Sequence, residues 1–98
     1  MAYRLRFSRA AKEVLEDLAA SPQYAAKLRK VNKALGLLQR DPRYPGLQSH
    51  KYSSLSGSQG EDVWDSYVEN NTPAAWRLFW HYGPASNVIT VVTIGPHP

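Results

Sequence analysis

The sequence predicts an α+β domain: an N-terminal strand, then an antiparallel helix hairpin packed on one face of a mainly antiparallel sheet of four or five strands. Three observations support this prediction. Apolar residues alternate with arginines near the N-terminus, recur at helical spacing between Ser8 and Asp41, and alternate again from residue 48 onward between short turns. Successive strands joined by short turns pair as an antiparallel meander, so the second half is expected to form most of the sheet.

Length and composition limit the possibilities. A chain of 98 residues is expected to form one domain, residues 1–98, around one modest core. There is no cysteine, which excludes disulfides and thiolate chemistry. The N-terminus "MAYRLRFSRA" lacks a signal-peptide core and no run of roughly 18 apolar residues occurs, so a cytoplasmic location without a membrane partner is expected.

The charge balance favours acidic partners. The formal net charge is +4, and the isoelectric point is about 9.6. A field of this sign attracts nucleic acid or an acidic protein.

The first half of the chain has sequence signals for one strand and the starts of two helices. Residues 3–7 alternate and predict a short half-buried strand whose apolar face is formed by Tyr3, Leu5 and Phe7. Ser8 is expected to cap a first helix, which ends at Ser21. Pro22 suits the first position of a second helix with Ser21 as its cap.

The second helix has the clearest pattern in the chain. Its apolar stripe consists of Tyr24, Leu28, Val31, Leu35 and Leu38. The residues between the stripe positions make a basic side that faces water or a partner: Lys27, Arg29, Lys30, Lys33 and Arg40. The stretch "DPRYPG" at 41–46 ends this helix.

Four strands are predicted in the second half, at residues 48–55, 62–68, 76–82 and 88–94, with a turn at 56–60. In the segment "WRLFWHY", alternation places Trp76, Leu78, Trp80 and Tyr82 on one face and Arg77, Phe79 and His81 on the other. The helices cover the first face, and the second is left for solvent or a ligand.

Arg77 and His97 are the main candidates for chemistry. A guanidinium on the uncovered face can bind a phosphate through two parallel hydrogen bonds; alternatively, Arg77 lies over Phe79 or pairs with Asp65. A histidine can transfer a proton near neutral pH, and "IGPHP" holds His97 between restraining glycine and prolines. The alternative is a frayed terminal residue.

Three further residues are weaker candidates. His50 and Lys51 are expected to point to opposite faces of their strand, and either is a candidate base or phosphate contact. His81 shares a face with Arg77 but is equally a packing residue in an aromatic setting. The histidine spacing is not that of a zinc site, and there is neither a phosphate-binding glycine loop nor a nucleophile-elbow serine.

The predicted elements are accompanied by three segments: "HKYSSLSG" before the middle strand, "WRLFWHY" before an apolar strand, and the terminal "IGPHP". Together with the order of the elements, these segments resemble the RelE/ParE superfamily of bacterial toxins. The resemblance covers essentially the whole chain. Members of the RelE-like branch with RNase activity cleave messenger RNA on the ribosome by attack of a ribose 2′-hydroxyl on the adjacent phosphate. This chemistry needs a base, an acid and positive charge, but no metal or other cofactor.

The resemblance also implies roles for individual residues. Arg77 matches the strand arginine that stabilises the phosphate, His97 matches the C-terminal histidine that acts as the acid, and His50 or Lys51 matches the position of the base. We expect Lys27, Lys30, Lys33 and His81 to contact RNA. The chain lacks the C-terminal extension with a catalytic tyrosine that some members have, and "GPHP" is less basic than many of their tails.

Two alternative functions stay open. The chain is a ParE-like inhibitor of DNA gyrase, since the ParE branch shares the fold, or it is a relative that keeps the fold and has lost its activity. The expected partners are a cognate antitoxin that folds on binding, together with the ribosome and messenger RNA. A homodimer or a toxin–antitoxin hetero-oligomer is the expected assembly.

Overall fold

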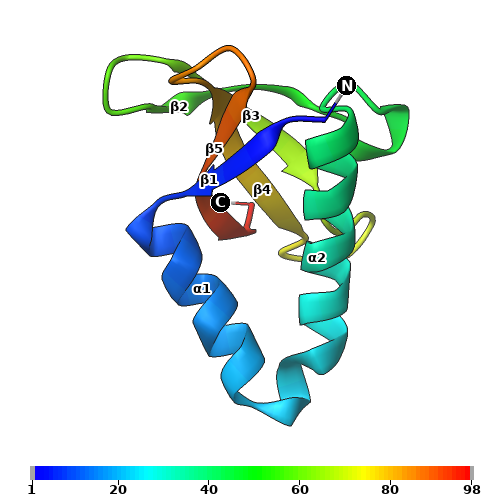
Figure 1. Ribbon diagram of the computed structural model, residues 1–98. Helices are drawn as coiled ribbons and strands as arrows, with labels where there is room; N and C mark the ends of the chain where they lie inside the picture. Colours follow the sequence, from blue (N-terminus) through cyan, green and yellow to red (C-terminus); the bar gives the residue numbers. More distant parts are fainter. Residues whose placement is uncertain (1, 98) are drawn as a thin grey trace.

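Figure 1 shows the fold of the computed structural model, which describes residues 2–97. In chain order the elements are β1 (Arg4–Phe7), α1 (Arg9–Ala20), the 3₁₀ helix η1 (Pro22–Tyr24), α2 (Ala25–Arg40), the 3₁₀ helix η2 (Pro45–Leu47), β2 (His50–Ser56), β3 (Asp62–Tyr67), β4 (Trp76–Tyr82) and β5 (Val88–Pro96). The predicted α+β class is confirmed. No helix within the described residues is long and apolar enough to cross a bilayer.

The five strands form one sheet in the order β1-β5-β4-β3-β2. Strands β2 to β5 make the predicted antiparallel meander, whereas β1 pairs with β5 in parallel. A parallel pair needs a long crossover, and here the two helices belong to it. Strands β1 and β2 are therefore the two edges of the sheet.

Helix α1 begins as predicted. The Ser8 hydroxyl accepts a hydrogen bond from the backbone N–H of Ala11 at 3.0 Å, which satisfies one of the free donors of the first turn.

The predicted start of the second helix is wrong. Ser21 makes no capping hydrogen bond, and η1 intervenes before α2 begins at Ala25. A 3₁₀ turn has three residues per turn, so Tyr24 does not continue the apolar stripe of α2 and is 43% exposed.

Both helices cover the same face of the sheet, and in Figure 1 they spread apart from the turn at η1. α1 packs mainly against β5, and α2 contacts β4. The core between the layers contains Ala11, Leu18, Val31, Ala34, Leu35, Leu38, Leu47, Leu78, Trp80, Ile89, Val91 and Ile94. The predicted apolar face of β4 is therefore the one that the helices cover.

The opposite face is less open than predicted. Tyr52 packs on Phe79 with ring centroids 5.1 Å apart, and Phe79 is buried. His81 is only 5% exposed, since its ring lies against Gly57 in the β2–β3 turn and its Nδ1 contacts the Tyr82 carbonyl. Its interpretation as an RNA contact is corrected here, because the ring is packed inside the fold; the packing alternative describes it.

Candidate active site

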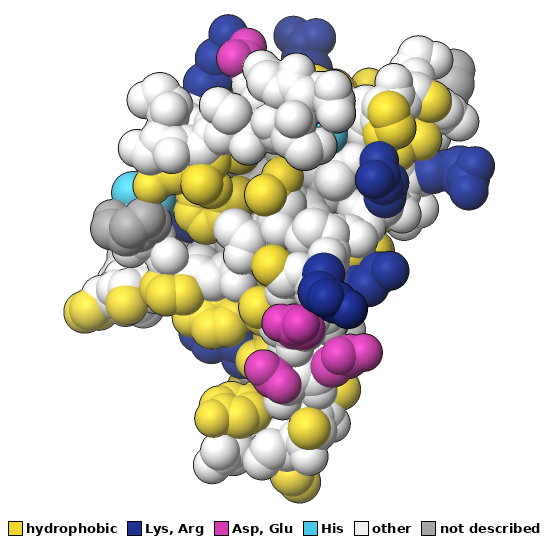
Figure 2. Space-filling view, turned by 90° about the vertical axis from the view of Figure 1, so that its left-hand side faces the viewer, with side chains coloured by type: hydrophobic (Ala, Val, Ile, Leu, Met, Phe, Trp, Pro, Cys, Tyr) yellow, Lys and Arg dark blue, Asp and Glu magenta, His cyan; other side chains and the backbone are white. Residues whose placement is uncertain are grey.

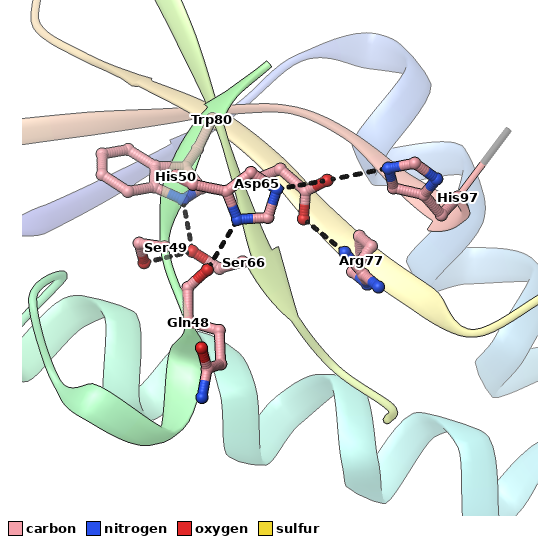
Figure 3. Close-up of polar contacts among 8 residues, drawn as sticks. All are labelled: Gln48, Ser49, His50, Asp65, Ser66, Arg77, Trp80 and His97. Carbon is pink, nitrogen blue, oxygen red and sulfur yellow. Dashed lines mark hydrogen bonds and ion pairs between the residues drawn. The ribbon is translucent and has the colours of Figure 1, made fainter. Parts of the chain in front are cut away.

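The register of the sheet brings four polar side chains together on the face that the helices leave uncovered (Figure 3). Asp65 lies in β3 with His50 of β2 as its direct cross-strand partner. Arg77 of β4 pairs with Tyr67, two residues after Asp65, so Arg77 is a diagonal neighbour of Asp65 on the same face. His97 follows the end of β5, beside the Arg77 end of β4.

Asp65 and Arg77 form the fixed centre of this site. The Asp65 carboxylate is fully buried and accepts a hydrogen bond from Nη1 of Arg77 at 3.1 Å. The guanidinium carbon of Arg77 lies 3.9 Å from the centre of the Tyr67 ring, a cation–π contact. Arg77 thus points to the predicted face, where it also makes the Asp65 pairing that we gave as the alternative interpretation.

His50 contacts the carboxylate from one side. Its Nε2 lies 3.6 Å from Oδ2 of Asp65, in ion-pair range but too far for a hydrogen bond. Its Nδ1 lies 2.8 Å from the carbonyl oxygen of Gln48. Because a carbonyl only accepts, Nδ1 carries the hydrogen and Nε2 is the nitrogen that takes up a proton. Gln48 has a φ of 50°, an uncommon left-handed conformation that orients this carbonyl.

His97 contacts the same carboxylate oxygen from the other side (Figure 3). Its Nε2 is 3.3 Å from Oδ2 of Asp65, and its ring lies edge-on to Tyr52 with centroids 5.7 Å apart. Its backbone N–H donates to the Ala75 carbonyl at 3.0 Å. The alternative of a frayed terminal residue is therefore wrong, because both the backbone and the ring of His97 are held.

The site leaves two buried polar atoms without hydrogen bonds to the described residues, Oδ2 of Asp65 and Nε of Arg77. Oδ2 lies 3.3 and 3.6 Å from Nε2 of His97 and His50, so the two imidazole rings are its electrostatic partners. His50 and His97 keep 50% and 38% of their side chains exposed, so a substrate has access to both rings. Within residues 2–97, no group of three or more His, Cys, Asp or Glu is arranged to hold a metal ion.

Lys51 lies outside the Asp65 site. As expected for the residue next to His50, it points to the other face, where its ammonium lies 5.8 Å from the centre of a Trp64 ring. It also pairs with the exposed Asp62 at 3.3 Å. The structure therefore brings His50, and not Lys51, to Arg77 and His97.

The basic residues of α2 have different surroundings. Lys27 and Lys30 pair with Glu69 at 2.8 and 3.4 Å, which ties α2 to the segment after β3. The hydrogen bond from Lys27, with help from the Trp76 N–H, lowers the pKa of Glu69 below 4.5 against the effect of burial. Lys30 and Lys33 both line a groove of about 590 Å³ between α2 and the end of β3.

Sequence reasoning missed the central position of Asp65, which it considered only as a partner of Arg77. The available signal was a carboxylate on the same face of its strand as Val63 and Tyr67, where an apolar residue is normal. Tyr52, which contacts both Phe79 and the His97 ring, was also missed.

Among the comparisons with known proteins, only the one with solved structures found matches. No protein-family model matches the sequence, and a search of the curated proteins found no significant match. The fold itself is that of the RelE/ParE-type toxins of toxin–antitoxin systems, as the resemblance predicted.

Three solved structures illustrate the likeness. The archaeal RelE–RelB complex from Pyrococcus horikoshii matches with a TM-score of 0.65 at 18% identity, over 98% of this chain and 96% of that chain. A YoeB/ParE toxin from Agrobacterium tumefaciens gives a TM-score of 0.70 at 14% identity, over 97% and 99%. The E. coli RelBE toxin–antitoxin complex gives 0.61 at 18% identity, over 99% of each chain.

Proposed function

We propose that this protein is the toxin of a type II toxin–antitoxin pair and that it cleaves messenger RNA on the ribosome. One observation carries the proposal: His50, His97 and Arg77 converge on the buried carboxylate of Asp65, on the sheet face away from the helices. Two proton carriers beside a fixed cation are what cleavage of RNA by its own 2′-hydroxyl requires.

His50 is the general base in this mechanism. With its hydrogen on Nδ1, held by the Gln48 carbonyl, it takes the proton of the 2′-hydroxyl on Nε2. The resulting imidazolium is stabilised by the Asp65 carboxylate, which lies 3.6 Å from the same nitrogen.

His97 is the general acid. As an imidazolium at ion-pair distance from Asp65, with Nε2 3.3 Å from Oδ2, it gives a proton to the departing 5′-oxygen. The bond from the 2′-oxygen to phosphorus forms as the bond to the 5′-oxygen breaks, leaving a 2′,3′-cyclic phosphate and a 5′-hydroxyl end. Arg77 contributes positive charge for the crowded phosphate, in an orientation fixed by Asp65 and Tyr67.

An antitoxin is the proposed partner. Solved neighbours of this fold include complexes of toxin with antitoxin, such as E. coli RelBE and DinJ–YafQ. A partner of acidic character suits this chain, whose net charge is +4.

Mapping RNA ends in cells tests the proposal. Brief expression of the chain is expected to produce new 5′ ends within translated regions, detected by primer extension. The new ends are expected to disappear with Arg77→Ala and with His97→Ala. They are expected to persist with the control Lys12→Ala, which removes one positive charge at an exposed position of α1. Cuts that persist in both site variants contradict the mechanism.

Growth arrest without RNA cuts has a different meaning. It favours a protein target such as gyrase, and plasmid supercoiling in the same cells then identifies that function. Normal growth with intact RNA points to an inactive protein of this fold.

A further inference from the structure

An aromatic cavity of about 560 Å³ lies at the start of β2, on the sheet face opposite the Asp65 site. Tyr44, Trp64, Trp80 and Tyr82 supply its aromatic lining, and Arg43 and Gln48 supply polar groups. The volume lies within the range of small-molecule sites. We refer to it as the aromatic cavity.

The rings of the aromatic cavity are ordered among themselves. Trp64 and Trp80 are stacked, with centroids 5.9 Å apart and an interplanar angle of 17°. Tyr82 lies edge-on to Trp80 at 5.0 Å. Tyr82 and Tyr44 nevertheless stay 39% and 45% exposed, so the cavity offers aromatic surface that no described residue covers.

Hydrogen bonds run from the cavity to the chain neighbours of Asp65 and His50 (Figure 3). Nε1–H of Trp80 donates to the Ser66 hydroxyl at 2.8 Å, and the Ser66 and Ser49 hydroxyls lie 2.6 Å apart. Ser49 gives its own hydrogen to the Pro42 carbonyl, so Ser66 is the donor to Ser49. Ser66 and Ser49 are the chain neighbours of Asp65 and His50, respectively.

The two sites are also adjacent across the edge of the sheet. His50 pairs with Asp65, and the next pair along is Lys51 with Trp64, whose side chains point to the other face. Strand β2 is an edge of the sheet, so the Asp65 site and the aromatic cavity lie on opposite faces beside the same edge. A nucleic-acid strand that crosses this edge passes from one face to the other.

We propose that the aromatic cavity binds a base of the RNA substrate next to the cleaved phosphate. This inference rests on the proposed function. Stacking surfaces beside cationic side chains are the recurring means of binding single-stranded nucleic acid. Here the exposed rings of Tyr44 and Tyr82 supply the stacking surface, and Arg43 lies in the lining. Lys51, over Trp64, supplies charge for the phosphate that crosses the edge.

A segment of a partner protein is the competing occupant. The RNA base is favoured for two reasons. The cavity combines flat rings with a cationic side chain, and Gln48, which lines it, accepts a hydrogen bond from the proposed catalytic His50 through its carbonyl. An apolar peptide side chain uses neither the cations nor this connection.

Binding of an uncleavable RNA tests the inference. The probe is a fluorescent 2′-O-methyl RNA hexamer, measured by anisotropy with the full chain. Tyr44→Ala is expected to weaken binding by about tenfold, the lower range for loss of one stacked base, whereas Tyr44→Phe retains it. Tyr24→Ala is the matched control, because Tyr24 is 43% exposed and lies in η1, outside the cavity.

A second probe series locates the base. Each hexamer of this series lacks the base at one position. The wild type is expected to bind one of these hexamers more weakly than the intact hexamer, whereas Tyr44→Ala is expected to bind that hexamer and the intact one equally. Equal binding by Tyr44→Ala and wild type, or no saturable binding by the wild type, overturns the inference. So does a Tyr44→Ala protein that keeps its RNA affinity but escapes neutralisation by the antitoxin.

The inference and the proposed function fail separately. RNA cuts that need His97 together with unaltered RNA binding by Tyr44→Ala refute only the cavity. A tenfold loss of binding in Tyr44→Ala together with cuts that persist in His97→Ala refutes only the catalytic assignment.

Discussion

Arg77 donates a hydrogen bond of 3.1 Å to Asp65, a carboxylate that is fully buried and that also faces both candidate catalytic histidines. The four side chains are therefore one electrostatic unit. A change at any one alters the surroundings of the other three, which makes their effects on stability and activity non-additive.

The Asp65–Arg77 pair is expected to show this coupling in stability. Arg77→Met leaves a buried carboxylate without its cation and should reduce the free energy of unfolding by about 3 kcal/mol. Asp65→Asn combined with Arg77→Met removes both charges and should recover most of that loss. Urea unfolding of the two single variants and the double variant measures the coupling, and strictly additive losses contradict it.

The two histidines are expected to act together in cleavage. His50→Ala or His97→Ala should each lower the rate of RNA cleavage on purified ribosomes by about 10²–10⁴-fold. The double variant should be little slower than the slower single variant, because base and acid serve the same step. Single-turnover rates test this prediction, and a double variant that shows the product of both losses is evidence for independent roles.

The cap of α1 offers a test of the N-terminal packing. Ser8→Ala removes the hydroxyl that accepts from Ala11 and donates to the Val92 carbonyl, so a loss of roughly 1–2 kcal/mol is expected. In a domain of about this size, such a loss lowers the Tm by several degrees. Ser21→Ala is the control, since Ser21 makes no capping bond and should melt like the wild type.

The Glu69 cluster predicts a pH dependence of stability. The Lys27 hydrogen bond lowers the pKa of Glu69, so the folded state binds this proton less readily than the unfolded state. The stabilisation is therefore present above pH 4.5 and is lost as the pH falls through the lowered pKa of the folded state.

Unfolding in urea at several pH values measures this effect. Glu69→Gln should be less stable than the wild type at pH 7, and the difference should shrink below pH 4.5. Glu16→Gln is the control, because Glu16 is an exposed residue of α1. Figure 2 shows Asp and Glu side chains gathered on the side of the molecule that includes α1. A difference for Glu69→Gln that does not change with pH refutes this assignment.

Periodicity predicts the fold well where one face of an element is buried. In β4 it assigned Trp76, Leu78 and Trp80 to the helix side and Arg77 to the other side, as the structure has them. It failed at Tyr24, where a proline-initiated 3₁₀ turn replaces the first turn of the helix. Spacing alone does not distinguish these two helix types over one turn.

The candidate site was predictable in part. Alternation placed Arg77 on the face away from the helices and put His50 and Lys51 on opposite faces, without deciding which of the two lies beside Arg77. His97 is held by a hydrogen bond to the Ala75 carbonyl, and His81 is buried against Gly57 in the turn between β2 and β3; neither contact follows from alternation. Contacts of this kind arise from strand register and twist, which one sequence does not specify. The central role of Asp65 appears only once His50, Arg77 and His97 are brought to it.

The most direct test of the central claim replaces one 2′-hydroxyl group of the substrate by hydrogen. A programmed ribosome complex carries messenger RNA with a single 2′-deoxynucleotide on the 5′ side of a mapped cut, beside the same RNA unmodified. Since the ribose 2′-hydroxyl is the proposed nucleophile, we predict cleavage of the unmodified RNA with a 2′,3′-cyclic phosphate product, and none at the deoxy position. Cleavage at equal rates in both RNAs would contradict 2′-hydroxyl attack through the Asp65 site.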